Sequence, residues 1–201
     1  MRDLDATTRS LSQAKTLGGI GSILTLLLLV PFGVGAVLVI VGWILILLAA
    51  KDISDTVKDK SIFDNAIISV VLAIAATAVF ASVVSRAFLG LIGLGRPPPT
   101  SAPFGAWSGL GAVAGIITGL SVAWILGVIA SIFLWQSFKI ITLKLDATLF
   151  STAALIYIIG SILTVVLVGF LLNFIAKILF VIAFLSLPES PPGPATGPTG
   201  A

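Results

Sequence analysis

The chain has no cysteine and no histidine among its 201 residues, and only 9% of its residues are charged. The absence of cysteine excludes disulfides, thiol nucleophiles and thiolate metal sites. The absence of histidine excludes imidazole ligands and histidine acids or bases. No other combination of residues resembles a catalytic, metal or cofactor site. We therefore expect a protein that is not an enzyme and that holds no cofactor.

The scarcity of charge also indicates where the protein resides. A soluble domain carries about 25% charged residues, because its surface must be hydrated. Here 58% of the residues are hydrophobic, and the mean hydropathy is +1.23. Hydrocarbon must therefore surround the fold, and the lipid bilayer is the expected partner. The net charge of +3 is small and its bases are dispersed, so we expect no nucleic-acid partner.

The first long apolar stretch, 17–50, is interrupted only by the sequence PFGVG at 31–35. A span needs about 20 apolar residues, and shorter ones suit weakly tilted helices. The stretch predicts two spans joined by a tight turn. The alternative for the N-terminus is a signal peptide, but the apolar stretch continues too far for one.

The remaining apolar stretches predict four further spans. The third covers about 66–88, and the fourth lies between Trp107 and Trp135, which are placed as interfacial aromatic residues would be. The stretch 148–187 is too long for one span. We divide it near Gly169 into a fifth and a sixth, with one span plus an interfacial helix as the alternative.

Three polar segments separate these spans. The charge-dense segment 51–65 predicts a solvated loop with a short interfacial helix, in which Ser61 and Asp64 resemble a capping box. A loop that docks a partner is the other interpretation. Consecutive prolines make 96–103 a loop, and polar character also returns at 136–147.

The predicted organisation has three parts. Residues 1–16 form a polar cytoplasmic segment, residues 17–187 form the transmembrane domain, and the proline- and glycine-rich residues 188–201 form a disordered tail. The fold class is an all-α polytopic transmembrane bundle, with six spans arranged as three hairpins.

The distribution of basic residues predicts the orientation. Cytoplasmic loops carry an excess of lysine and arginine, and a cytoplasmic N-terminus places most of these residues inside. The plasma membrane, with both termini cytoplasmic, is the expected location. The inner residues are Arg2, Arg9, Lys15, Lys51, Lys58, Lys60, Lys139 and Lys144, and the outer ones are Arg86 and Arg96.

A hexapeptide, IGSILT, occurs twice, at 20–25 and at 159–164. Each copy opens a terminal hairpin, and the two copies enter the membrane in the same direction. This predicts a parallel repeat of the first and third hairpins. Parallel repeats occur in transporters, with the substrate at the repeat interface, and they also arise from duplication without any transport role. The sequence favours neither origin.

Small residues recur every four positions in the fourth span. Such spacing allows two helix backbones to approach closely, although the row drifts around a helix of 3.6 residues per turn. We expect close packing against another helix, in the same chain or in another one. The predicted helix-packing residues are Gly111, Gly115, Gly119, Ala123 and Gly127.

Lys177 is the one charge placed deep in a predicted span, and Asn173 lies one turn before it. Tyr157 of the fifth span is expected to line the same interior. An ionisable group inside a membrane suggests function, so Asn173 and Lys177 form a possible intramembrane polar site. The structural alternative, a lysine whose stem extends to an interface, is the stronger expectation, because no acidic residue lies at that depth.

Short segments in a fixed order resemble an uncharacterised, largely archaeal family of multi-pass membrane proteins, domain of unknown function 996. Leu185 and Thr56 stand where that family usually has aromatic residues. The resemblance implies a membrane fold and no assigned activity. The matching segments are LGGIGSIL (17–24), WIL (43–45), KDISD (51–55), SIFDNA (61–66), QSF (136–138) and IAFLSLP (182–188).

These observations favour a non-enzymatic scaffold or accessory subunit that packs through small-residue helix faces, against itself or within a larger membrane complex. The alternative is a small solute or ion transporter or channel, suggested by the repeat and by Lys177. A membrane enzyme is the weakest hypothesis, because the aspartates of 51–65 do not have the spacing of a known acidic site.

Overall fold

The computed structural model describes residues 2–27, 34–92, 105–166 and 168–188, and these residues are helical, with no strand among them. Five of the described helices are long and apolar enough to cross a membrane; the exception is α1, whose first half is polar. The fold is therefore an all-helical membrane bundle, and the count of six spans stays a prediction. The elements are α1 (Arg2–Leu26), α2 (Val34–Val57), α3 (Lys60–Leu91), α4 (Gly105–Leu145), α5 (Thr148–Ile162), the 3-10 helix η2 (Leu163–Val165) and α6 (Val168–Leu185).

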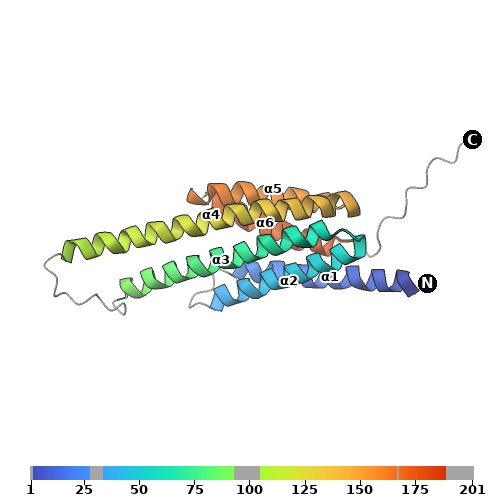
Figure 1. Ribbon diagram of the computed structural model, residues 1–201, viewed down its shortest axis with the longest axis horizontal. Coiled ribbons are helices and arrows are strands. Elements are labelled where there is room, and N and C mark those ends of the chain that lie inside the picture. Colours follow the sequence, from blue (N-terminus) through green and yellow to red (C-terminus); the bar gives the residue numbers. More distant parts are fainter. Residues whose placement is uncertain (1, 28–33, 93–104, 167, 189–201) are drawn as a thin grey trace, which may run out of the picture.

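The helices form three antiparallel hairpins, α1–α2, α3–α4 and α5–α6 (Figure 1). Neighbouring hairpins pack through α2 against α3 and through α4 against α5, and α6 closes the bundle against α1. The bundle end at which α1 begins and α6 ends also carries the α2–α3 and α4–α5 connections (Figure 1). We call it the turn end.

The two connections at the turn end are much shorter than the sequence predicted, so the expectation of a loop over 51–65 is wrong. Helix α2 continues through Val57, and only Lys58 and Asp59 precede α3. Both connections turn through a non-glycine residue with positive φ, Lys58 at 54° and Asp146 at 52°. The left-handed conformation directly after a helix is the common way to end it.

A hydrogen bond from a helix hydroxyl to a carbonyl five residues later is common to both connections. The Asp59 backbone N–H donates to the Ser54 carbonyl (3.1 Å), as in a Schellman motif, and the Ser54 hydroxyl donates to the Asp59 carbonyl (2.8 Å). At the other connection the Thr142 hydroxyl donates to the Ala147 carbonyl (3.2 Å). Two short hydroxyl side chains thus replace a loop.

The predicted capping box of Ser61 and Asp64 is also wrong, because the N-cap of α3 is Asp59. Its carboxylate accepts the Ser61 backbone N–H at 3.1 Å and the Ser61 hydroxyl. An N-cap aspartate satisfies a helix donor that would otherwise have no partner.

The core is richest near the turn end, where Phe138, Phe150, Phe180 and Phe184 are almost completely buried and meet edge to face. Leu11 and Ala14 are also fully buried and belong to this core. Both come from residues 1–16, which the sequence predicted as a polar cytoplasmic segment. The structure shows residues 2–16 as the first part of α1, and the cytoplasmic location of the segment stays a prediction.

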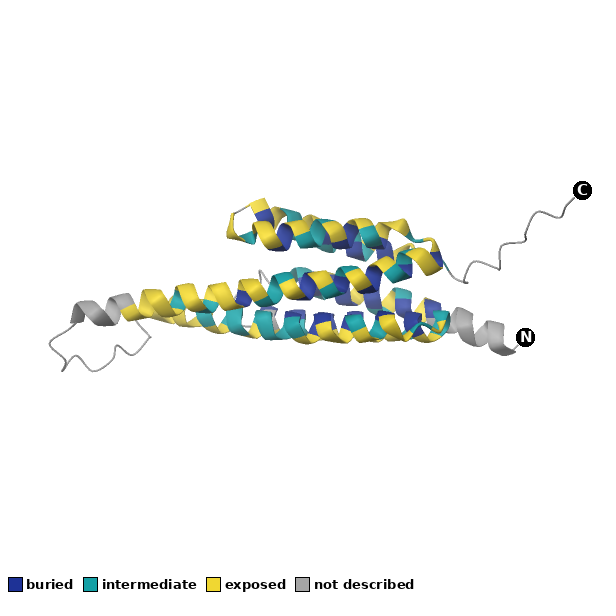
Figure 2. Cartoon of the chain, turned by 45° about the horizontal axis from the view of Figure 1, so that its top comes forward, coloured by how far each residue is buried: buried dark blue, intermediate teal, exposed yellow. Residues whose placement is uncertain are grey.

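Helices α3 and α4 extend well past the other four at the end opposite the turns (Figure 1). They contain 32 and 41 residues, which correspond to about 48 and 61 Å of helix. Figure 2 shows that the extended parts are largely exposed. Their exposed side chains include Val84, Phe88, Val113 and Ile117.

The predicted division of 148–187 near Gly169 is confirmed. Helix α5 tightens into η2 before α6 begins at Val168, and each half meets the criteria for a candidate span. A Cβ on Gly169 would collide with the backbone of Leu163 and Thr164. Glycine therefore allows the two helices to meet across a very short turn. The proline segment 96–103 and the tail 189–201 lie outside the described residues.

Candidate functional site

The first copy of the repeated hexapeptide lies where α1 and α2 approach most closely. A Cβ on Gly21 would lie 2.7 Å from the Gly42 carbonyl oxygen, and a Cβ on Gly42 would lie 2.6 Å from the Gly21 carbonyl oxygen. Separations below 3.0 Å essentially never occur for real Cβ atoms. The two glycines are thus in reciprocal backbone contact, and this contact sets the spacing of the first hairpin.

The second copy has the corresponding position in the third hairpin. A Cβ on Gly160 of α5 would lie 2.6 Å from Oδ1 and 2.8 Å from the backbone nitrogen of Asn173 on α6. Each hexapeptide also ends on a threonine whose hydroxyl donates back into its own helix. Thr25 donates to the Ser22 carbonyl (2.7 Å), and Thr164 donates to the Gly160 carbonyl (2.7 Å). The repeat is therefore a structural repeat as well as a sequence repeat.

The two polar residues of α6 bind the two hexapeptide threonines. Asn173 Nδ2 donates to Thr164 Oγ1 (2.9 Å), and Lys177 Nζ donates to the Thr25 carbonyl (2.7 Å). Thr25 lies one residue from the end of α1, where the helix dipole is negative and the last carbonyls lack intrahelical donors. Lys177 therefore places a cation at a helix C-terminus and connects the first hairpin to the third.

One hydroxyl beside this arrangement has no partner. Ser22 is fully buried, and its Oγ makes no hydrogen bond. It lies one turn after Gly18, whose Cβ would collide with the Phe184 ring of α6, so Ser22 is on the side of α1 that faces α6. We call Ser22, Thr25, Thr164, Asn173 and Lys177 the polar junction.

The sequence identified two of the five residues of the polar junction. Asn173 and Lys177 were predicted from their polarity in an apolar span, and the structure places them on one face of α6. Tyr157 was expected beside them; its ring contacts Trp43 (centroids 6.3 Å apart) and Phe180 (5.6 Å). The duplicated hexapeptide was the available signal for the threonine and serine partners.

The small-residue row of α4 divides into two parts. A Cβ on Gly119 would collide with Val83 of α3, and Ala123 is 7% exposed, so these two residues pack within the chain. A Cβ on Gly111, Gly115 or Gly127 would have nothing within 4 Å. Gly111 and Gly115 lie about 40° apart around α4, and we call these two residues the open glycine face, because no neighbouring helix of the described part of the chain occupies it. Gly127 lies about 120° further around the helix and does not belong to this face.

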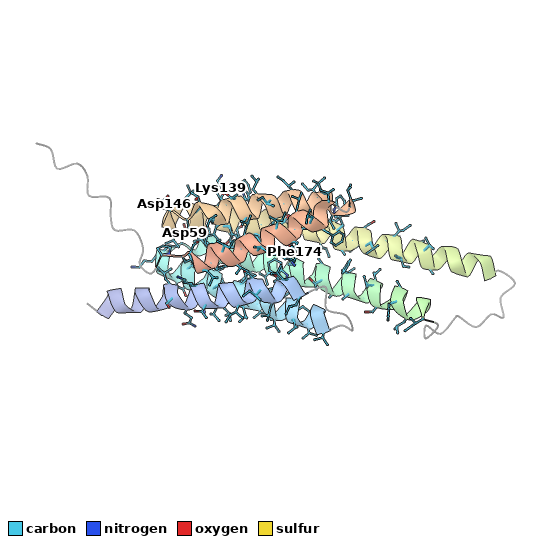
Figure 3. All side chains as sticks on the ribbon, turned by 180° about the vertical axis from the view of Figure 1, so that it is seen from behind. Asp59, Lys139, Asp146 and Phe174 are labelled. Carbon is cyan, nitrogen blue, oxygen red and sulfur yellow. The ribbon has the colours of Figure 1, made fainter. Side chains whose placement is uncertain are left out.

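Charged side chains gather at the turn end instead. Lys144 Nζ lies 3.7 Å from Asp59 Oδ2, and Lys139 Nζ lies 5.3 Å from the Trp135 ring centroid. Figure 3 shows Asp59, Lys139 and Asp146 toward this end of the bundle. The hydrogen bond from the Ser61 hydroxyl lowers the pKa of Asp59, and Lys144 contributes in the same direction.

Comparison with known proteins agrees with this architecture. A family described as "Protein of unknown function (DUF996)" matches residues 38–178. The uncharacterized protein MJ1644 of Methanocaldococcus jannaschii is 34% identical over 181 residues, covering 89% of this chain and 94% of the relative. No solved structure matches. The family match over most of the chain and the similarity to this relative lead to one conclusion: the chain belongs to the DUF996 family.

Proposed function

We propose that this protein is a non-enzymatic membrane subunit that assembles with another transmembrane helix through the open glycine face of α4. One observation supports the proposal above all others. Gly18, Gly21, Gly42 and Gly160 are each pressed against a neighbour, whereas the glycines of the open face meet nothing. The chain therefore carries a helix-packing surface that its own helices leave unused.

The energetics favour an occupied face. Glycine destabilises a helix interior by about 1 kcal/mol relative to alanine. Close backbone approach against a second helix offsets this cost, since small residues increase van der Waals contact and allow interhelical hydrogen bonds in lipid. A face that only contacts lipid gains nothing from glycine. A second copy of this chain is the simplest occupant, because each copy would present the same row to the other.

The proposed orientation places the turn end in the cytoplasm. Lys51, Lys58, Lys60 and Lys144 belong to this end, while Arg86 is near the opposite end of α3. The excess of lysine at one end is the pattern of cytoplasmic loops. The termini would then be cytoplasmic and the extended part of α3 and α4 would point outward, in the plasma membrane.

Cysteine crosslinking tests the association directly, because the natural sequence contains no cysteine. We expect Gly115→Cys to form an oxidant-induced dimer in native membranes. Val113→Cys is the matched control, since Val113 is 54% exposed and lies about 200° around the same helix. Equal crosslinking at both positions would contradict the proposal. A protein that is a monomer in mild detergent and crosslinks to no partner in native membranes would also contradict it.

A transport role is the second candidate, and the polar junction is the observation that favours it. Lys177 and Thr25 connect the first and third hairpins, which is the interface where parallel-repeat transporters bind substrate. Flux of ions or small solutes into proteoliposomes tests this role. Flux that is unchanged by Lys177→Met would remove the lysine from the pathway, and absence of flux for all tested solutes would contradict transport.

A further inference from the structure

Lys177 carries its charge in the middle of an apolar helix. It lies about 14 Å from the start of α6 and about 12 Å from its end, within a helix that is a candidate span over its whole length. A charge at that depth is costly unless another group compensates it. Within the described residues the ion pair is Lys144 with Asp59, so no carboxylate of those residues pairs with Lys177.

Donors outnumber acceptors between α1 and α6. An ammonium group has three donors, and Lys177 uses one of them on the Thr25 carbonyl. The buried Ser22 hydroxyl adds another donor without a partner. The nearby Ser22 carbonyl already accepts the Thr25 hydroxyl. A group that complements this arrangement must accept hydrogen bonds and carry negative charge.

Asn173 reduces this imbalance but does not remove it. Its Nδ2 is engaged with Thr164, and its buried Oδ1 lies near Gly160 of α5 and has no hydrogen-bond partner. This one neutral acceptor provides no negative charge for Lys177. Reversing the amide would place two acceptors together, because the Thr164 hydroxyl proton is donated to the Gly160 carbonyl.

We propose that the polar junction binds a small monovalent anion between α1 and α6, held by Lys177 and Ser22. The close contact of Gly18 of α1 with Phe184 of α6 leaves little room between these helices, so the proposed ligand is a halide or a short carboxylate. The anion neutralises the lysine, satisfies the free hydroxyl and stabilises the contact between the first and third hairpins. This site is independent of association through α4.

Thermal unfolding of the full chain in detergent tests the proposal. Chloride is exchanged for gluconate at constant ionic strength, so that general salt effects cancel, and acetate is compared in a parallel series. A ligand present at 100 times its Kd raises the apparent Tm by roughly 5 to 10 °C for a chain of this size. We expect such a rise for the natural protein in chloride, and a rise in acetate would assign the site to carboxylates as well as halides.

Three variants decide whether the effect arises at the polar junction. Lys177→Met should abolish the chloride response, and Ser22→Ala, which keeps the charge, should weaken it several-fold. Lys139→Met removes an exposed lysine at the turn end and should respond like the natural protein. An equal response in all four proteins, or no response in the natural protein, overturns the proposal.

Discussion

Replacing Gly21 by alanine should separate the first hairpin. The added Cβ would meet the Gly42 carbonyl oxygen at 2.7 Å, Leu45 Cβ at 2.9 Å and the Ile46 backbone nitrogen at 3.0 Å. Two of these atoms are backbone, so no side-chain rotation relieves the collision. Helix α1 must move away from α2, and the contacts along the whole hairpin weaken.

The magnitude follows from two opposing effects. Overpacking a tight contact costs about 1–3 kcal/mol, while alanine gains up to about 1 kcal/mol in helix propensity over glycine. Because the collision is with backbone atoms, the upper end of the overpacking range applies, and the expected net loss is about 2 kcal/mol in the free energy of unfolding. Gly160→Ala should lose a similar amount, because its Cβ would meet the backbone nitrogen of Asn173 at 2.8 Å.

Unfolding in mixed micelles with increasing SDS, followed by circular dichroism, measures these changes. Gly90→Ala is the matched control, because a Cβ there has nothing within 4 Å and the substitution should be neutral or slightly stabilising. If Gly21→Ala and Gly90→Ala shift the midpoint equally, the close approach of α1 and α2 does not limit stability and the reasoning is refuted.

Three further predictions concern the turn end and the core. Phe138→Ala should lower the free energy of unfolding by about 3 kcal/mol or more. Phe174, labelled in Figure 3, is 44% exposed, and Phe174→Ala should change the free energy of unfolding by less than about 0.5 kcal/mol. Comparable losses in the two variants would contradict the described core. Lys58→Gly should raise the thermal midpoint, since glycine relieves roughly 0.5–1 kcal/mol of left-handed strain, and a lower midpoint would show that Lys58 contributes by another contact. The pKa of Asp59 is lower in the folded state, so the ionised carboxylate stabilises the fold above about pH 4, and this stabilisation is lost as the pH falls through the lowered pKa. Asp59→Asn should therefore remove this part of the acid sensitivity in pH-dependent unfolding curves. Identical curves for the variant and the natural protein would contradict the prediction.

The apolar spans and the division near Gly169 could be predicted because hydrocarbon imposes a length on each span, and the apolar stretch 148–187 is too long for one. The short connection at Lys58 could not be predicted from the sequence. Its composition is that of a solvated loop, and only the Ser54 hydrogen bonds reveal that the helices continue almost to the turn. Polar residues of α1 were assigned to the surface for the same reason, although Leu11 packs into the core.

The candidate site shows a similar division. A lysine in an apolar span can be recognised from sequence, since such a residue is costly there. The partner of this lysine, Thr25, cannot be recognised from sequence, because it is 152 residues away and accepts the hydrogen bond through a backbone carbonyl, which every residue possesses. Likewise, spacing alone predicts that α4 packs closely, but only the structure distinguishes Gly119, which meets Val83, from Gly115, which meets nothing.

The length of α4 has a consequence for the surrounding lipid. Its candidate span, Gly111–Leu145, has 35 residues, or about 52 Å of helix, against a hydrocarbon thickness of about 30 Å. Its end after Trp135 carries Lys139 and Lys144, which belong outside the hydrocarbon. The part before it, 111–135, is about 37 Å long and fits a bilayer of about 30 Å only when tilted by about 37°, near the upper limit for transmembrane helices. The longest hairpin therefore favours a strongly tilted arrangement or the thicker regions of the membrane.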